Sequence, residues 1–411
     1  MRRIFQSMLA QGRIPLRPDP WLETTPPPLD PASDRVEGML LGLAVGDALG
    51  RRLESLATSR RTVDTRRYPG GRGKVSDDTQ LAFWTLEHLL EQGEISPRRL
   101  AERFAAEPVR GLGRSLREFV SRVKDGKPWY ECAPGSAGNG ALMRIAPVLL
   151  PHLRHPGPDL WADTALAAVL THRDGASVSS CLAYVHLLWE LLRQSAPPSP
   201  AFYLDTFLQA AERLEPEGRY RARGFEGRLC DYVRREVTRA WREDLPARAA
   251  CDRWGSGPYL METVPCLIYL LMRHGQDPGE AVVRAVNDTY DADTLGALVG
   301  AAVGALHGKE GFDELWLRQL DPRISATGPT LFQVVDRALQ RWAPRPPSPL
   351  RGGASGRPSG ERRAPWDRLL HRLGALETGR PVSHGDLHLV PLLDLHAEPG
   401  RPVTLLNEAL E

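Results

Sequence analysis

Apolar residues recur at three- and four-residue spacing through much of the chain, the pattern of helices that bury one face. The spacing is clearest over residues 78–92, 160–171, 177–193 and 262–273. One further helix start is marked by Asp277 as N-cap, Pro278 at the first helical position and Glu280 at the third. Alternating β-branched runs, which would indicate strands, are scarce. We therefore predict a mostly helical fold.

Two segments of the chain carry glycines at intervals of four residues. They are Gly38, Gly42, Gly46 and Gly50 in the first segment and Gly296, Gly300 and Gly304 in the second. On a helix this spacing places the glycines on one face, where another backbone can approach closely. Each glycine costs a helix about 1 kcal/mol relative to alanine. The repetition therefore predicts tightly packed central helices, and Asp47 within the first segment argues against a membrane pair.

Composition divides the chain into four parts. Residues 1–35 are rich in proline, which interrupts regular helix and central strand, and are predicted to be an N-terminal arm. This arm is either a partly ordered leader or a segment that packs on a partner or over the mouth of the active site. Residues 36–342 form the helical unit, residues 343–365 a flexible linker rich in Pro, Gly, Ser and Arg, and residues 366–411 a small appendage of unassigned role.

Charge and cysteine content narrow the class of protein. A formal net charge of +2 over 411 residues argues against a dedicated nucleic-acid binder. The five cysteines are odd in number and have no C-x-x-C spacing, which fits a reducing compartment rather than a disulfide framework or a zinc site. No apolar stretch reaches the roughly 18 residues of a membrane span. We expect a cytoplasmic protein that does not contact a membrane.

Two acidic segments are the strongest candidates for chemistry. Ser76-Asp77-Asp78 begins the helix 78–92, so by itself it is more simply explained as a helix start with a capping serine. Residues 288–294 carry three carboxylates and no basic neighbour, so they need a cation or open water. If the glycine-rich helices bring the two segments together, divalent cations would neutralise at least four carboxylates. Carboxylate and hydroxyl oxygens suit Mg²⁺ or Mn²⁺.

Five short motifs follow one another within the helical unit. They are Gly38-Met-Leu-Leu-Gly-Leu-Ala-Val-Gly-Asp-Ala-Leu-Gly50 with Glu54 following, Ser76-Asp77-Asp78-Thr79-Gln80, Gly138-Asn139-Gly140-Ala-Leu-Met-Arg144-Ile-Ala-Pro147, Thr171-His172, and Asp291-Ala-Asp293-Thr294-Leu-Gly-Ala297. In this order they resemble the ADP-ribosylglycohydrolase family, over about 260 residues. Any one of the motifs is common, whereas the ordered set is specific.

The resemblance implies an all-α orthogonal multi-helix bundle with a central binuclear site for two divalent cations, Mg²⁺ or Mn²⁺. In the family, the ligands of these cations come from the two acidic motifs. Carried over to this sequence, they are Ser76, Asp77, Asp78, Asp291, Asp293 and Thr294. Serine at position 76 replaces the commoner threonine and keeps its hydroxyl. The catalytic tasks fall to Glu54, Asp77 and Asp293.

The resemblance also implies a substrate cleft. Residues that match the loop lining the ADP-ribose pocket are Ser136, Gly138, Asn139 and Gly140. His172 matches a histidine on the adenosine side, although a histidine that only packs in the core is the alternative. The sequence departs from the family at Thr289-Tyr290, where glycines are usual. It also has alanine at position 137, so an aromatic side chain that stacks on the ligand must come from elsewhere.

The implied reaction is hydrolysis of the bond between C1″ of the distal ribose and its acceptor, which releases ADP-ribose. The expected substrate is ADP-ribosylarginine on a protein. Serine-linked, nucleic-acid-linked and O-acyl-ADP-ribose stay open, and nucleic acid is expected only as such a substrate. A second class of function also stays open: a blocking protein that neutralises an ADP-ribosyltransferase, with or without hydrolysis, through residues 1–35.

Overall fold

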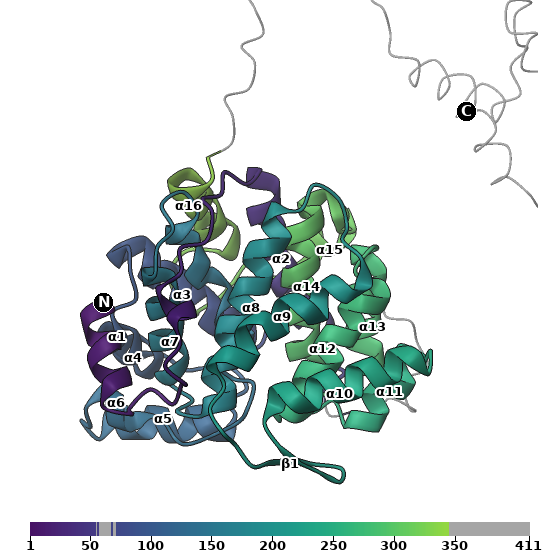
Figure 1. Ribbon diagram of the computed structural model, residues 1–411. Helices are drawn as coiled ribbons and strands as arrows, with labels where there is room; N and C mark the ends of the chain where they lie inside the picture. The colour runs from purple at the N-terminus through teal and green to yellow at the C-terminus, as the bar shows by residue number, and fades with distance from the viewer. Residues whose placement is uncertain (55, 57–66, 69–70, 345–411) are drawn as a thin grey trace, which may run out of the picture. The chain divides into compact units, whose positions relative to one another are not determined.

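Helices form nearly all of the regular structure in residues 1–54, 56, 67–68 and 71–344, which the computed structural model describes (Figure 1). The α-helices are α1 Arg2–Ala10, α2 Ser33–Gly50, α3 Asp77–Gln92, α4 Pro97–Ala106, α5 Arg114–Lys124, α6 Trp129–Cys132, α7 Asp159–Val169, α8 Gly175–Arg193, α9 Pro200–Leu214, α10 Leu229–Arg242, α11 Ala247–Trp254, α12 Leu260–His274, α13 Pro278–Asp288, α14 Ala292–His307, α15 Glu314–Gln319 and α16 Leu331–Trp342. Short 3-10 helices are η1 Pro20–Glu23, η3 Leu142–Arg144, η4 Ala146–His152 and η5 Lys309–Gly311. One hairpin pairs β1 Tyr220–Ala222 with β2 Phe225–Gly227. The prediction of an all-α fold is confirmed.

The helices predicted from apolar spacing are present as α3, α7, α8 and α12, with ends within a few residues of the expected ones. The predicted start of α13 is also confirmed. The Asp277 carboxylate accepts a hydrogen bond of 2.9 Å from the Glu280 backbone N–H, and Pro278 is the first helical residue. The C-terminal appendage and all but the first two residues of the predicted linker lie outside the described residues.

Helices α2 and α14 pack antiparallel along their glycine faces. Gly38 faces Gly304, Gly42 faces Gly300 and Gly46 faces Gly296, while Gly50 faces Ala292. A Cβ added to any of these glycines would lie closer than 3.0 Å to backbone atoms of the other helix. Contact this close requires residues without side chains, so the repeated cost of glycine is offset by direct backbone packing. The prediction from the glycine spacing is confirmed.

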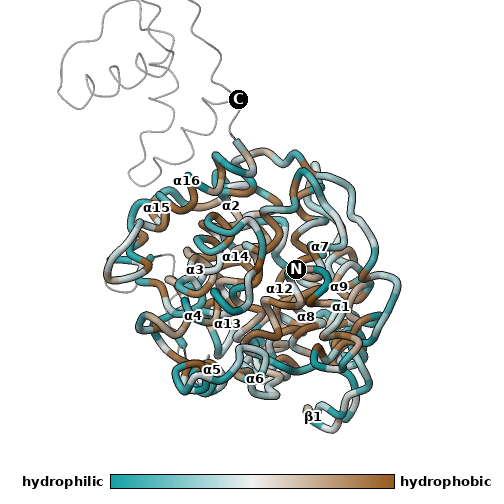
Figure 2. Tube along the Cα trace, turned by 90° about the vertical axis from the view of Figure 1, so that its left-hand side faces the viewer, coloured by the Kyte–Doolittle hydropathy of each residue, from teal (hydrophilic) through white to brown (hydrophobic). Residues whose placement is uncertain are grey.

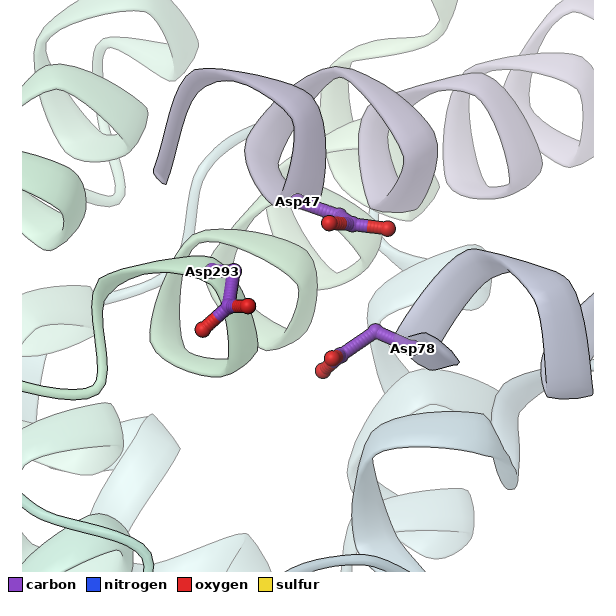
Figure 3. A group of neighbouring side chains, drawn as sticks. All are labelled: Asp47, Asp78 and Asp293. Atoms are coloured by element: carbon purple, nitrogen blue, oxygen red, sulfur yellow. The ribbon is translucent and has the colours of Figure 1, made fainter. Parts of the chain in front are cut away.

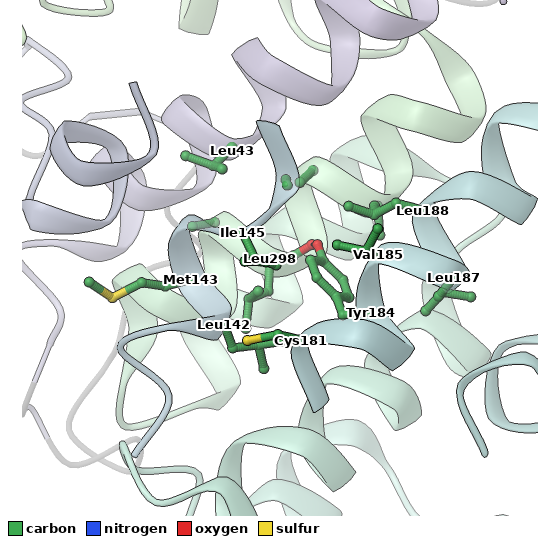
Figure 4. Packing of buried hydrophobic residues seen from close by; sticks show 14 of the residues in the cluster. Leu43, Leu142, Met143, Ile145, Cys181, Tyr184, Val185, Leu187, Leu188 and Leu298 are labelled. Atoms are coloured by element: carbon green, nitrogen blue, oxygen red, sulfur yellow. The ribbon is translucent and has the colours of Figure 1, made fainter. Parts of the chain in front are cut away.

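A single apolar core surrounds this pair. Side chains from α2, η3, α8 and α14 meet in it, with Leu43, Leu142, Tyr184 and Leu298 fully or almost fully buried (Figure 4). The Tyr184 hydroxyl donates a 2.6 Å hydrogen bond to the Leu298 carbonyl, which ties α8 to α14. Apolar residues gather on the inner helices, α8 and α12 among them (Figure 2). By length and composition α8 could cross a membrane, but 94% of its apolar window is buried within the protein, so packing in the core explains its composition.

Residues 1–35 pack on the helical unit. They contain the helix α1, which packs on α7. The Trp21 ring lies against Trp161 with centroids 4.2 Å apart, and the backbone N–H of Arg17 donates to the Leu214 carbonyl over 2.8 Å. The helix ends at Ala10, before the first proline at position 15, so the prolines do not interrupt it. None of residues 1–35 lines the cleft described below.

Candidate metal centre and substrate cleft

Three buried carboxylates meet where α2, α3 and α14 come together. Asp47, Asp78 and Asp293 each have a carboxylate oxygen within 4.8 Å of the others. Figure 3 shows the three side chains pointing toward one another from different helices. The glycine packing of α2 on α14 brings Asp47 beside Asp293, and α3 starts next to both. Segments far apart in the sequence therefore form one acidic centre.

A second group of carboxylates shares Asp293. Glu54, just beyond the end of α2, and Asp291, at the start of α14, have oxygens within 4.8 Å of one another and of Asp293. Glu54 is exposed whereas the two aspartates are buried. Asp77 belongs to neither group, but it lines the same cleft beside Gly111, where a Cβ would lie 2.9 Å from its Oδ1. All the acids expected in the site are thus brought to one place.

Burial and mutual repulsion disfavour the charged form of the carboxyl groups in this centre. Burial raises the pKa of Asp77 to about 8 and that of Asp291 to about 6, with Glu54 among the neighbouring charges that add to both shifts. Burial, then neighbouring carboxylates, raise the pKa of Asp78 and Asp293 well above the usual range. Without a compensating cation Asp77, Asp78 and Asp293 would hold protons near neutral pH. The centre therefore favours bound positive charge.

The donors in the centre fit hard divalent cations. Asp78 is almost fully buried, and its Oδ1 has no hydrogen-bond partner among the described residues. An unpaired buried carboxylate oxygen is costly unless a ligand meets it. The centre offers only oxygen atoms, which Mg²⁺ and Mn²⁺ prefer. The residues present therefore fit such ions.

Asp47 was missed as a site residue, and its hydrogen bonds show what it does. Its carboxylate accepts from the Ser76 backbone N–H at 2.9 Å, from the Thr79 N–H at 3.1 Å and from the Thr79 hydroxyl at 2.5 Å. It therefore caps the start of α3 and holds the segment that carries Asp78. A fully buried aspartate within an otherwise apolar, glycine-spaced helix was the signal that could have revealed it.

The expected hydroxyl donors take different positions. Ser76 is the N-cap of α3, and its hydroxyl donates to Asp78 Oδ2 over 2.9 Å. It does not line the cleft, whereas Thr294 does. The acids of residues 288–294 have no basic neighbour in the sequence, but in the fold Asp288 forms ion pairs with Arg248 at 3.0 Å and with Arg284 at 3.6 Å. Asp288 is therefore outside the acidic centre.

Asn139 lies in the cleft as expected, but its amide is directed at a carboxylate. Its Nδ2 donates to Asp291 Oδ2 over 2.6 Å and to the Thr263 hydroxyl over 3.0 Å. Its backbone N–H donates to the Pro258 carbonyl over 3.0 Å. Asn139 therefore orients Asp291 and also ties two loops together, in addition to forming the cleft wall.

The acidic centre opens into a cleft of about 420 Å³. Its wall includes every residue expected in the substrate site: Ser136, Gly138, Asn139, Gly140 and His172. The sequence did not reveal two further parts of the lining, which are Gly111 with Gly113–Leu116 and Pro258–Tyr259. Tyr259 is an aromatic side chain in the cleft, the kind that Ala137 does not supply. An elongated ligand can contact the acids and the glycine turn together.

The family assignment follows from comparison with known proteins. The sequence profile described as ADP-ribosylglycohydrolase matches residues 28–347, most of the chain and all of the site. The chain belongs to the ADP-ribosylglycohydrolase family. Family members are ADP-ribosyl hydrolases, so the protein is an enzyme of this class.

Several named proteins match most of this chain. The ADP-ribosyl-[dinitrogen reductase] glycohydrolase of Rhodospirillum rubrum is 26% identical and aligns over 71% of this chain and 92% of its own. The ADP-ribosylarginine hydrolase Tri1 of Pseudomonas putida is 26% identical over 78% and 83% of the two chains. A solved ADP-ribosylglycohydrolase-related protein complex is 27% identical with a TM-score of 0.57, covering 76% of this chain and 98% of the other.

Thr289-Tyr290 stands before the second acidic motif, where the resemblance led us to expect glycines. The Thr289 hydroxyl donates to the Ala285 carbonyl at the end of α13. Ser256 holds the next two residues: its Oγ accepts from the Tyr290 N–H and its carbonyl from the Asp291 N–H, both at 2.9 Å. Ser256 adopts a positive φ of 51°, rare for a residue with a side chain. The backbone that presents Asp291 is thus fixed by the loop after α11.

Proposed function

We propose that this enzyme hydrolyses the C1″ bond of ADP-ribosylarginine on proteins and releases ADP-ribose, with two divalent cations in the acidic centre. One observation carries the proposal: carboxylates from α2, α3 and α14 converge on a cleft that is also lined by Gly138, Asn139, Gly140 and His172. The names of relatives that act on ADP-ribosylarginine and on ADP-ribosylated dinitrogen reductase support this substrate. A guanidine leaving group also suits an acidic cleft.

The residues that would hold two Mg²⁺ or Mn²⁺ ions come from the two acidic motifs. They are Ser76, Asp77, Asp78, Asp291, Asp293 and Thr294. When bound, the cations would supply positive charge and Lewis acidity beside the distal ribose. Asp47 and Asn139 are positioning residues, since they hold the Ser76–Asp78 segment and Asp291 through hydrogen bonds.

The chain's own carboxylates can carry the proton of the reaction. Hydrolysis adds a water oxygen to C1″, breaks the C1″–N bond and transfers a proton to the leaving guanidine nitrogen. Asp77 and Glu54 both line the cleft, and Asp293 lies beside Glu54 in the acidic centre. We assign proton transfer to these three residues. Glu54 is the exposed member of the set, so it faces the side from which a protein substrate arrives.

The test is release of ADP-ribose from arginine-, serine- and DNA-linked ADP-ribose in the presence of Mg²⁺ or Mn²⁺. Asp77→Ala and Asp293→Ala should abolish release and lower the metal content after dialysis, measured by elemental analysis. Asp231→Ala is the matched control, because Asp231 is an exposed acid outside the cleft that pairs with Arg228. Full activity in either cleft variant contradicts the proposal. Release only from serine- or DNA-linked ADP-ribose contradicts the arginine assignment alone.

The same variants separate hydrolysis from blocking of an ADP-ribosyltransferase. A blocking protein would still protect the transferase target when Asp77 is replaced, whereas a hydrolase would not. The packing of residues 1–35 on their own domain gives the blocking alternative no structural support. We also propose a cytoplasmic location, because the five cysteines are all free and buried.

A further inference from the structure

A buried arginine is connected to the cleft histidine through one hydroxyl. Arg144, at the end of η3, donates from Nη2 to the Ala167 carbonyl over 2.8 Å and to the Thr171 Oγ1 over 2.7 Å. Thr171 Oγ1 lies 3.0 Å from Nδ1 of His172. Thr171 is completely buried and His172 almost completely. The three residues form a continuous chain of hydrogen bonds that leads to the cleft wall.

The direction of this chain follows from what each group can donate. The guanidinium of Arg144 is a donor only, so Thr171 Oγ1 must accept from it. The hydroxyl proton of Thr171 then remains free, and the acceptor the structure offers it is Nδ1 of His172. With the other tautomer, Nδ1–H would point at Oγ1 and the buried hydroxyl proton would have no acceptor. A buried donor without a partner is costly, so the arrangement favours Nδ1 as acceptor and the proton on Nε2.

The opposite edge of the ring faces the cleft. A Cβ on Gly138 would lie 3.5 Å from His172 Nε2, and one on Gly140 would lie 2.8 Å from its Cε1 and 3.1 Å from Nε2. The glycine turn thus leaves this edge uncovered by side chains. Among the described residues, the Nδ1 contact is the one hydrogen bond of the ring. The Nε2 edge is therefore directed toward whatever occupies the cleft.

We propose that Arg144 and Thr171 are positioning residues that hold His172 as the Nε2–H tautomer, so that the cleft presents a hydrogen-bond donor to an acceptor atom of the ADP-ribose moiety. The choice of ADP-ribose as ligand rests on the proposed function, whereas the tautomer does not. A ligand with a donor at this position would be rejected, because two hydrogens would face each other.

The cost of burying Arg144 supports a role of this kind. Its Nε and Nη1 have no hydrogen-bond partner among the described residues, and its guanidinium lies over the Phe104 ring at 5.0 Å. An apolar side chain of similar size would avoid that cost. Burial, followed by the charge of Arg144, lowers the pKa of His172 to about 3, so the ring stays neutral. A charged ring would also donate from Nδ1 and would leave the buried hydroxyl proton of Thr171 without an acceptor.

The tautomer can be read directly from ¹⁵N chemical shifts of the full-length protein labelled at histidine. The chain has 11 histidines, and the signals of His172 are those that disappear in His172→Asn. We expect wild-type His172 to show a protonated Nε2 and an unprotonated Nδ1. Thr171→Val should move these shifts toward a mixture of tautomers, and Thr171→Ser should restore them. A wild-type ring protonated on Nδ1, or shifts unchanged in Thr171→Val, overturns the proposal.

Binding of ADP-ribose, measured by titration calorimetry, gives a second readout. Thr171→Val should weaken it about fivefold, the size of one net hydrogen bond, and Thr171→Ser should not. The matched control is Thr164→Val, which removes another fully buried hydroxyl that is bonded within α7 to the Leu160 carbonyl. This control should change neither the tautomer nor the affinity; equal effects in both valine variants contradict a positioning role. If the wild type neither binds nor releases ADP-ribose, the proposed function fails, while the spectra still decide the tautomer.

Discussion

Replacing Gly46 with alanine tests whether backbone contact between α2 and α14 builds the acidic centre. In an ordinary helix this change stabilises the protein by up to about 1 kcal/mol, because alanine is the better helix former. At Gly46 the added Cβ would lie closer than 3.0 Å to backbone atoms of Gly296 and Ala297, whereas ordinary contact begins at 3.4 Å. The atoms that this Cβ would meet are backbone atoms of α14, so no side chain can rotate away to make room. The two helices must separate instead.

The expected result is a net loss of about 1–3 kcal/mol in the free energy of unfolding, the usual range for overpacking a core. The next residue is Asp47, which holds the start of α3 through Ser76 and Thr79. A shift of α2 away from α14 therefore also separates Asp47 from Asp293. We expect weaker binding of Mg²⁺ or Mn²⁺ in addition to the loss of stability.

The assay pairs thermal unfolding in chelator with calorimetric titration of Mn²⁺. Gly279→Ala is the matched control: Gly279 is a helical glycine in α13 whose added Cβ would meet only the Asp277 side chain, at 3.4 Å. The control should leave the melting temperature unchanged or slightly higher, and the cation affinity unchanged. If Gly46→Ala raises the melting temperature as the control does, the close packing does not limit this site.

Three further changes probe the site and its supports. Asn139→Ala removes the hydrogen bond to Asp291 and should weaken cation binding by about 10–100-fold in calorimetry; unchanged affinity would show that Asp291 needs no such support. In chelator, the wild type should lose stability as the pH rises from about 4 to 8. Burial raises the pKa of Asp77 from 3.8 to about 8, so the folded state keeps a proton that the unfolded state has released; Asp77→Asn should flatten this part of the curve, and an unaltered slope would contradict it. Trp21→Ala should lower the free energy of unfolding by about 3–5 kcal/mol, because the buried Trp21 ring packs on Trp161, and should leave kcat unchanged. A lower kcat without a loss of stability would indicate that the N-terminal segment takes part in the active site.

Local patterns in the sequence were sufficient for α3, α7, α8, α12 and the start of α13, and for the acids at the starts of α3 and α14. Apolar spacing depends on residues within a turn or two, and the Asp277 cap depends on contacts three residues apart. The glycine spacing also predicted the α2–α14 contact, because only another backbone explains so many missing side chains on one face. The N-terminal helix α1 was missed for a local reason: the prolines of residues 1–35 begin only at position 15.

The supports of the site could not be predicted, because each depends on a residue far away in the chain. Asn139 bonds Asp291 from 152 positions away, and Asp47 bonds Ser76 from 29 positions away. Tyr259 enters the cleft because the loop after α11 pairs with the Gly138 turn, a contact that only the tertiary fold creates. The motifs predict which types of residue form the site, whereas the role of each residue depends on its hydrogen-bond partners in the folded protein.

The pairing of α2 with α14 determines when the acidic centre can form during synthesis of the chain. The ribosome synthesises Ser33–Gly50 long before Ala292–His307, so the glycine face of α2 lacks its contact with α14 during most of synthesis. Contacts over such sequence separation form slowly and late. Asp291 and Asp293 arrive with the last helices of the domain, after Asp47 and Asp78. A nascent or truncated chain that ends before α14 therefore holds only part of its carboxylates, and the acidic centre is complete only once nearly the whole domain has been made.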